Sequence, residues 1–209
     1  MTSSDDVASV PPTVTIPAGE SFARFAVTSR RVADDRVATI TATTAGSRAS
    51  LTFEVWAINA PVYFKVFGDL GNSILDGDVR RFVPGNSTIV AECEGNEVRM
   101  SFAKGGETWT ARFKAPGNEP IGTRSIEVVR PAPKDLEDAV GLLEIAGRGR
   151  SCNTKTFGRF SVNEIDLQNN RVNVFDASFV QYCDDRPEAL YGDLRLVNVA
   201  PGSSSSCVQ

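Results

Sequence analysis

Apolar and polar residues alternate in short runs along the first part of the chain. The runs TVTI, SFARFAVT, RVATITATT and ASLTFEVWA lie between Thr13 and Ala57 and are separated by the turn-forming segments PAGE and AGS. Short period-2 runs with frequent turns are typical of an all-β sandwich, and β-branched residues suit a half-buried pleated surface. The pattern therefore predicts a first β-sandwich domain over residues 1–58.

The same alternation resumes after residues 59–61, which we interpret as a linker. Runs such as YFKVFG, NEVRMSFAK, ETWTARFK and RVNVFDASFVQYC are separated by turns that contain Gly, Asn or Pro. In the passage PKDLEDAVGLLEI we expect a loop or short helical turn over 134–139 and then a strand. The predicted fold class is all-β, with a second, larger β-sandwich domain over 62–199 and a flexible Ser-rich tail over 200–209.

Composition excludes several classes of partner. The chain has 209 residues and a formal net charge of −4 at pH 7, without the long basic run expected of a nucleic-acid-binding protein. No apolar run approaches the roughly 18 residues that indicate a membrane-spanning helix. The start MTSSDDVASVPP has neither the basic segment nor the apolar core of a signal peptide. If the protein is secreted, its signal has been removed or lies upstream.

The chain has no histidine, which excludes Ser-His-Asp and Cys-His catalysis and every histidine-containing metal site. The stretch GRGRSCNTKTFGRF lacks the Lys-Ser or Lys-Thr pair and the following helix of a phosphate-binding loop. Its cysteine, Cys152, has no base beside it that would activate a nucleophile. We therefore expect no enzyme activity, with a hydrolase that uses two facing carboxylates as the last-ranked alternative, and a disulfide is the role that fits Cys152 best. Four cysteines allow three pairings.

The first runs also carry a resemblance. The segments SSDDVASVPPTVTIPAGESFARFAVTS and ATITATTAGSRASLTFEV resemble the bacterial immunoglobulin-like repeats of secreted and surface proteins. The resemblance covers about residues 1–57 and implies an immunoglobulin-like sandwich. Such repeats normally begin with further strands, so the first domain is expected to be incomplete at its N-terminus. Either the chain is cut from a longer one, or another chain supplies the strand.

The later part of the chain resembles a second family. The segments GRGRSCNTKTFGRFSVNEI, VNVFDASFVQYCDD and ALYGDLRLVN are similar to a cysteine-containing β-sandwich domain of secreted bacterial proteins that has no established activity. The resemblance covers roughly residues 60–199, although Tyr182 stands where the family usually has histidine. It implies a disulfide between Cys152 and Cys183. Cys93 and Cys207 then form a second disulfide, link to another chain or remain free.

Two further sets of residues are candidates for binding. Asp69, Asp76 and Asp78 offer oxygen ligands for calcium, the only cofactor that the sequence suggests, but Asp-Gly is also an ordinary turn. Trp109 and Tyr63 would bind sugars if their rings were exposed, although aromatic residues in alternating strands more often form the core.

These observations lead to a functional hypothesis. We expect a non-enzymatic structural, adhesive or assembly module of a bacterial surface or secreted protein, located outside the cell or on its surface. Its expected partners are other protein chains or surface glycans, and strand donation between sheet edges would give a homo-oligomer or filament. The alternative is a carbohydrate-binding accessory module of a secreted enzyme, which an exposed row of aromatic residues would favour.

Overall fold

The computed structural model describes residues 1–57, 60–128, 141–152, 156–169, 171–202 and 206–207. The described part of the chain contains strands and no helix, so the predicted all-β class with sandwich packing is confirmed. The chain divides into two compact units, Met1–Ala60 (unit 1) and Pro61–Gln209 (unit 2), with the division inside the predicted linker. The short helical turn expected over 134–139 lies outside the described residues.

Unit 1 is a small pair of sheets. A three-stranded sheet has the order β1-β4-β5, and β2 pairs with β3. The strands are β1 (Thr2–Ser3), β2 (Ala8–Ser9), β3 (Thr28–Ser29), β4 (Arg36–Thr44) and β5 (Ser47–Val55). The buried core of unit 1 consists of Val7, Ala8, Ala38 and Val55, with Val32 and Phe53 packed against it.

Two runs in unit 1 do not form the strands that their alternation predicts. Residues 13–16 are not in a strand, and of the run SFARFAVT only Thr28 belongs to one, as the first residue of β3. Phe22, Phe25 and Val27 remain exposed. The physical reason is that a strand needs a neighbouring backbone, and the described residues provide one to this segment only at β2. Alternation was therefore a sufficient signal for β4 and β5 but not for these runs.

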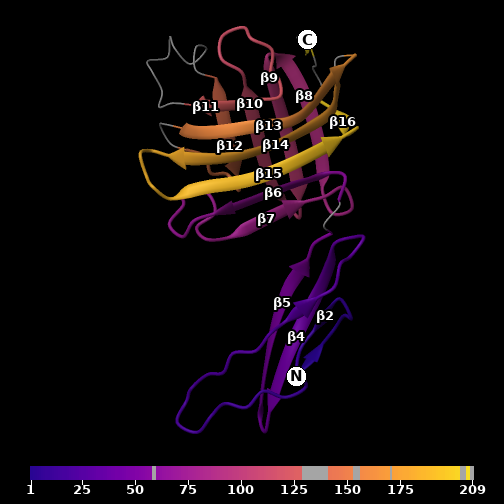
Figure 1. The fold of residues 1–209 in the computed structure, drawn as a ribbon, viewed down its shortest axis with the longest axis vertical. Coiled ribbons are helices and arrows are strands. Elements are labelled where there is room, and N and C mark those ends of the chain that lie inside the picture. Colours follow the sequence, from indigo (N-terminus) through magenta and orange to yellow (C-terminus); the bar gives the residue numbers. More distant parts are fainter. Residues whose placement is uncertain (58–59, 129–140, 153–155, 170, 203–205, 208–209) are drawn as a thin grey trace. The chain divides into compact units, whose positions relative to one another are not determined.

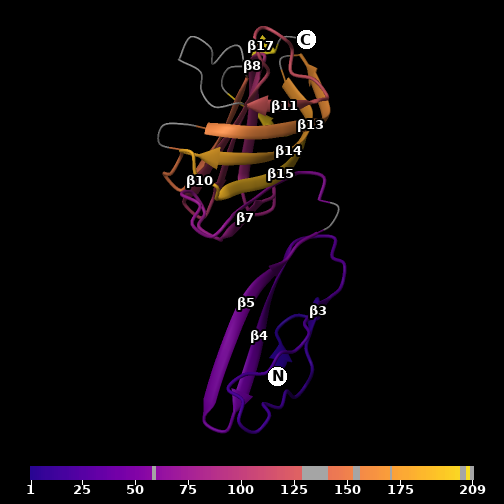
Figure 2. The same ribbon diagram turned by 60° about the vertical axis from the view of Figure 1, so that its left-hand side comes forward.

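Unit 2 is a sandwich of two larger sheets. The β8 sheet has the order β12-β10-β9-β8-β16, with β17 also paired to β8, and the β14 sheet has the order β11-β13-β14-β15-β6-β7. Their strands run across one another in both ribbon views (Figures 1 and 2). The β8 sheet consists of β8 (Thr88–Gly95), β9 (Glu97–Lys104), β10 (Glu107–Lys114), β12 (Leu142–Gly147), β16 (Ala200–Pro201) and β17 (Ser206–Cys207). The β14 sheet consists of β6 (Tyr63–Gly68), β7 (Val79–Phe82), β11 (Ser125–Val128), β13 (Thr156–Gln168), β14 (Arg171–Cys183) and β15 (Ala189–Val197).

The two sheets enclose an aromatic core. Phe64 stacks on Phe102 with ring centroids 4.2 Å apart, and Phe113 contacts Phe160 and Phe175 edge-on or tilted. Each of these side chains alternates along its strand with an outward-facing residue, as expected for a sheet with one buried face. Burial of large aromatic side chains is the main source of stability in such a core.

The Ser-rich end of the chain differs from the predicted flexible tail. Ala200 and Pro201 pair with Val90 and Ala91 of β8, and Ser206 and Cys207 pair further along the same strand. Both pairings are parallel, whereas the other ladders of unit 2 are antiparallel. Composition alone suggested a linker, but the edge of β8 offers backbone partners that override this preference.

Candidate binding surfaces

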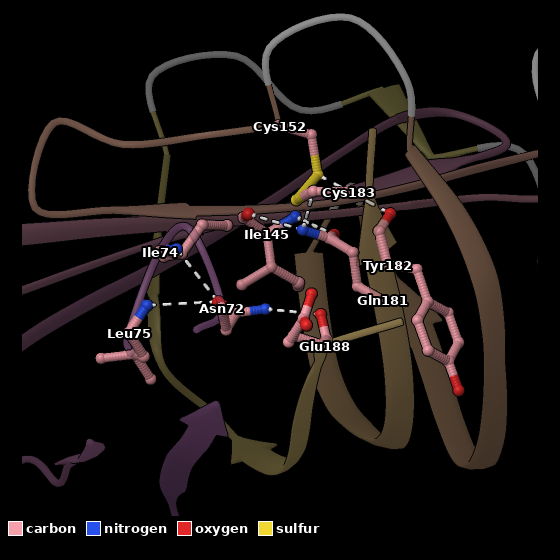
Figure 3. The surroundings of a disulfide bond; sticks show 9 residues. All are labelled: Asn72, Ile74, Leu75, Ile145, Cys152, Gln181, Tyr182, Cys183 and Glu188. Atoms are coloured by element: carbon pink, nitrogen blue, oxygen red, sulfur yellow. Dashed lines mark hydrogen bonds between the residues drawn. A yellow bond between two sulfur atoms is a disulfide. The ribbon is translucent and has the colours of Figure 1, made fainter. Parts of the chain in front are cut away.

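The stretch around Cys152 forms a turn that is followed by a disulfide bond (Figure 3). The Gly147 and Arg150 backbones exchange two hydrogen bonds of 2.9 Å, and Arg148 and Gly149 between them both have positive φ angles, 59° and 70°. This is the geometry of a tight two-residue turn. Cys152 is joined to Cys183 in a disulfide whose Cα atoms are 4.9 Å apart. The stretch therefore serves as a cross-linked turn.

Gly147 is needed for a packing reason. A Cβ atom at this position would lie only 2.1 Å from Cδ2 of the Trp109 indole. The indole is 1% exposed and its Nε1 donates a hydrogen bond of 2.8 Å to Glu107. The hypothesis that Trp109 binds a ligand is therefore wrong. Its ring fills the core because β10 points every second side chain inward, and the missing Cβ of Gly147 leaves room for it.

A buried glutamine joins the two sheets next to the disulfide. Gln181 of β14 is fully buried, accepts a hydrogen bond of 2.7 Å from the Ile145 N–H and donates one of 3.0 Å to the Ile145 carbonyl. Its Nε2 also lies 3.5 Å from the Cys152 sulfur. Ile145 belongs to β12 of the β8 sheet, so the Gln181 amide acts across the sandwich as a backbone partner for an edge strand (Figure 3).

The remaining cysteines are described only in part. Cys93 is fully buried on β8, and no described cysteine is a free thiol. The side chain of Cys207 lies outside the described residues. A link between Cys93 and Cys207 therefore stays a prediction.

The three aspartates proposed for calcium have separate partners. Asp69 accepts a hydrogen bond from the Ala189 N–H, Asp76 accepts one from the Gly71 N–H, and Asp78 accepts one from the Val79 N–H. Within the described residues, no group of three or more acidic or cysteine side chains could hold a metal ion. These carboxylates organise the loop between β6 and β7 as turn residues.

Tyr63 lies on the outer face of the β14 sheet, as a binding residue would. The Arg81 guanidinium is 5.8 Å from the centroid of its ring. Burial, with a smaller contribution from the charge of Asp193 and a hydrogen bond to it, raises the pKa of Tyr63 to about 12. Tyr63 is therefore a neutral phenol at physiological pH, held by charged neighbours.

Four aromatic rings gather on the same face of the β14 sheet as Tyr63, with Phe67 exposed and the other three half-buried. Phe67 stacks on Tyr191 with ring centroids 5.0 Å apart, and Phe157 stacks on Tyr182 at 5.1 Å. Tyr191 lies two residues beyond the β15 partner of Tyr182, so the two pairs follow one another across β13, β14, β15 and β6. Figure 3 shows the Tyr182 ring on the opposite side of β14 from Gln181. We call Phe67, Tyr191, Tyr182 and Phe157 the aromatic strip.

The aromatic strip cannot be recognised from the sequence alone. Alternation shows that Tyr182 and Tyr191 face away from the buried positions of their own strands. The order of the strands and their register bring the four rings together, and neither can be obtained from alternation. The strip is a partly exposed row of aromatic residues, the kind of feature that would favour the alternative hypothesis of a carbohydrate-binding module.

The outer face of the β8 sheet carries charge instead. Glu97 of β9 is 5% exposed and receives ion pairs of 2.7 Å from both Arg99 and Arg112. Arg112 also pairs with Glu144 of β12 at 2.8 Å, which continues the network across the sheet. Burial by itself raises the pKa of Glu97, but hydrogen bonds from the two guanidinium groups outweigh it and leave the pKa below its ordinary value.

The Glu97 network predicts an acid-dependent loss of stability. Because the pKa of Glu97 is lower in the folded state than the ordinary value of 4.5, its contribution is present at neutral pH and disappears as pH falls through the folded-state pKa. We expect Glu97→Gln to lower the free energy of unfolding by about 1–3 kcal/mol at neutral pH, between the values for exposed and buried pairs. Urea unfolding at several pH values tests this.

The matched control for Glu97→Gln is Glu127→Gln, at an exposed position of β11. This variant should unfold like the wild type at every pH. A difference between Glu97→Gln and the wild type that persists unchanged in acid would show that the effect does not come from the carboxylate charge.

No family model, no curated protein and no solved structure matches the chain. The fold establishes that the chain is all-β with several antiparallel sheets, which agrees with the fold class that the family resemblance implied. In the described part of the chain, no helix is long and apolar enough to cross a membrane. The disulfide is consistent with an oxidising compartment.

Proposed function

We propose that the chain is a non-enzymatic extracellular module of a bacterial surface or secreted protein, with structural, adhesive or assembly roles. Unit 1 acts as an immunoglobulin-like module that associates with a second copy by adding a strand at its sheet edge. The observation that carries this proposal is the open outer edge of β5. Within the described residues β5 pairs with β4 only, along its full length from Ser47 to Val55.

The register identifies which backbone groups of β5 are available. A two-residue turn joins β4 to β5, so the closing pair Thr44–Ser47 exchanges backbone hydrogen bonds and every second pair after it does the same. Ser50 and Thr52 fall in the alternate pairs, where their hydroxyls bond to Thr41 and Thr39 across the ladder. Their backbone N–H and C=O groups therefore point away from β4, towards the open edge.

The side chains next to this edge are apolar on one face. Leu51 is 67% exposed although it lies on the same face of β5 as Phe53 and Val55, which belong to the core side of the sheet. A cavity of about 450 Å³ lies at the same end, lined in part by Phe53, Val55, Trp56 and Val27. An added strand that paired with β5 would cover Leu51 and satisfy the edge.

The same chain offers an extended segment that suits this edge. Phe22, Phe25 and Val27 are exposed and lie in a run whose alternation is that of a strand. Donation of residues 21–27 by a second copy would pair their backbone with β5 and place Phe25 and Val27 together on one face of the added strand, where they could cover Leu51. Exposed apolar strand edges are recognised routes to association between chains.

Proline at position 52 is the sharpest test of the edge. Thr52→Pro removes the outward N–H and leaves the β4–β5 ladder intact, because proline is tolerated where the N–H faces away from the sheet. We expect the wild type to self-associate with increasing concentration and Thr52→Pro to weaken this association about tenfold or more. Sedimentation velocity over a concentration series measures both.

Thr52→Val is the matched control, because it also removes the hydroxyl but keeps the backbone N–H. It should associate like the wild type. A synthetic peptide of residues 20–29 should compete with self-association. If the wild type stays monomeric and folded at the highest concentration that its solubility allows, the proposed assembly through β5 is wrong.

A further inference from the structure

The aromatic strip of unit 2 has the dimensions of an extended binding surface. Its rings occupy four neighbouring strands of the β14 sheet, and a strand spacing of about 4.8 Å makes the strip roughly 14 Å long. Phe67 is 39% exposed, and Val79 beside it on β7 extends the apolar surface at the sheet edge. A ligand that follows the strip would contact several rings in succession.

A continuous row of polar side chains runs alongside the strip. Two residues from the strip on β15 and β6, and four residues from it on β14 and β13, cross-strand partners form an unbroken series over the whole sheet. This polar row consists of Ser125, Ser161, Ser178, Asp193, Lys65 and Arg81. Apart from Arg81, which is only 6% exposed, its members offer hydroxyl, carboxylate and ammonium groups, which both donate and accept hydrogen bonds. The apolar surface is therefore narrow and bordered by hydrogen-bonding groups.

Carboxylates on both sides of Tyr191 define the charge of a suitable ligand. The Tyr191 hydroxyl donates a hydrogen bond of 3.4 Å to Asp69 on one side, and Asp193 follows two residues later on the same face of β15. The Lys65 ammonium lies 5.9 Å from the centroid of the Phe67 ring, so charges of both signs lie beside the rings, and this mixed surface favours a ligand without net charge over an anionic chain such as a nucleic acid or a sulfated glycan. A wide apolar protein partner would bury the charged side chains of the polar row under an apolar surface.

We propose that the aromatic strip and the polar row together bind a neutral polysaccharide. Pyranose rings have an apolar face of C–H groups, which packs on aromatic rings, and hydroxyl edges, which exchange hydrogen bonds with serine and carboxylate groups. The protein surface has a matching arrangement, because a strip of aromatic rings lies next to a row of hydrogen-bonding groups. This site lies on unit 2 and does not depend on the edge pairing proposed for unit 1.

The test measures retention of the whole chain on neutral polysaccharides. We expect the wild type to bind at least one of cellulose, chitin and xylan, and not to bind heparin, a sulfated glycan. Phe67→Ala and Tyr182→Ala each remove one ring of a different stacked pair, and each should weaken binding about tenfold. Two variants are used so that the result survives if one of them fails to fold, which circular dichroism reports.

Ring-conserving and off-strip variants complete the design. Phe67→Tyr and Tyr182→Phe should bind within about twofold of the wild type, as should Leu70→Ala, which removes an 82% exposed apolar side chain outside the strip. Thr52→Pro should also bind normally, which separates this site from assembly through β5. The inference is overturned if no neutral polysaccharide retains the wild type, or if folded Phe67→Ala and Tyr182→Ala bind as well as it does.

Discussion

Loss of the disulfide between Cys152 and Cys183 is expected to lower the free energy of unfolding of unit 2 by about 3–4 kcal/mol. The bond closes a loop with a sequence separation of 31 residues, and the chain-entropy relation gives this magnitude for such a loop. A typical domain has a net stability of only about 5–15 kcal/mol, so the expected loss is a large part of the total. The bond also holds the end of β14 close to the turn after β12, where Gln181 connects the two sheets.

The measurement is urea unfolding of the double variant Cys152→Ala, Cys183→Ala. Fluorescence of Trp109 reports on unit 2 when Trp56 of unit 1 is replaced by phenylalanine. The double variant isolates this bond, whereas a reductant acts on every accessible disulfide. Peptide mass spectrometry without reduction should recover Cys152 and Cys183 in one linked pair. Ready alkylation of Cys152 in the unreduced protein, or a loss of stability below about 1 kcal/mol, would contradict the prediction.

The same experiment bears on the compartment. Structural disulfides form and persist outside the reducing cytosol, so a bond that contributes several kcal/mol to stability supports the proposed extracellular location. The bond also makes the glycine- and arginine-containing stretch before Cys152 a structural element. Arg148 and Arg150 belong to the tight turn, and their charges do not activate a thiol.

Much of unit 2 could be predicted from the sequence because its strands have one buried face. Phe113 and Phe160 lie at the inward positions of runs whose alternation predicted strands, and both are fully buried. The binding role expected for Trp109 was wrong because it was inferred from residue type. A tryptophan at an inward position of an alternating strand packs in the core like other apolar side chains. Gln181 was not identified, because a polar residue at an inward position has no signature that distinguishes it from an irregular strand.

Register and strand order limited the prediction of the surfaces. Phe67 and Tyr191 come from distant parts of the sequence and meet only because β6 and β15 are neighbours in the β14 sheet. In unit 1 a predicted strand did not form, because residues 13–16 have the alternation of a strand but no strand partner among the described residues. Pairing depends on three-dimensional neighbours, and these are absent from a local pattern.

Replacement of Gln181 by methionine is expected to lower the free energy of unfolding of unit 2 by about 3 kcal/mol. Methionine has a similar volume and shape but lacks the amide, so it leaves the buried N–H and C=O groups of Ile145 without their partner. Each buried polar group that loses its partner costs about 1–3 kcal/mol, and no bulk water reaches this site to compensate, since Gln181 is fully buried. Urea unfolding, again followed by Trp109 fluorescence, measures the loss.

Hydrogen exchange separates this local cause from a general weakening of the core. In the wild type the Ile145 amide should be among the protected amides of β12, because its hydrogen bond to Gln181 substitutes for a neighbouring strand. In Gln181→Met this amide should exchange faster than the amides of β12 that are bonded to β10. Ser178→Met is the control, since it places the same side chain on the outward face of β14 and should change stability by about 0.5 kcal/mol or less. Unchanged protection of Ile145 in Gln181→Met would mean that the hydrogen bonds from the Gln181 side chain do not hold β12 against the β14 sheet. The disulfide alone would then hold this end of the sandwich together.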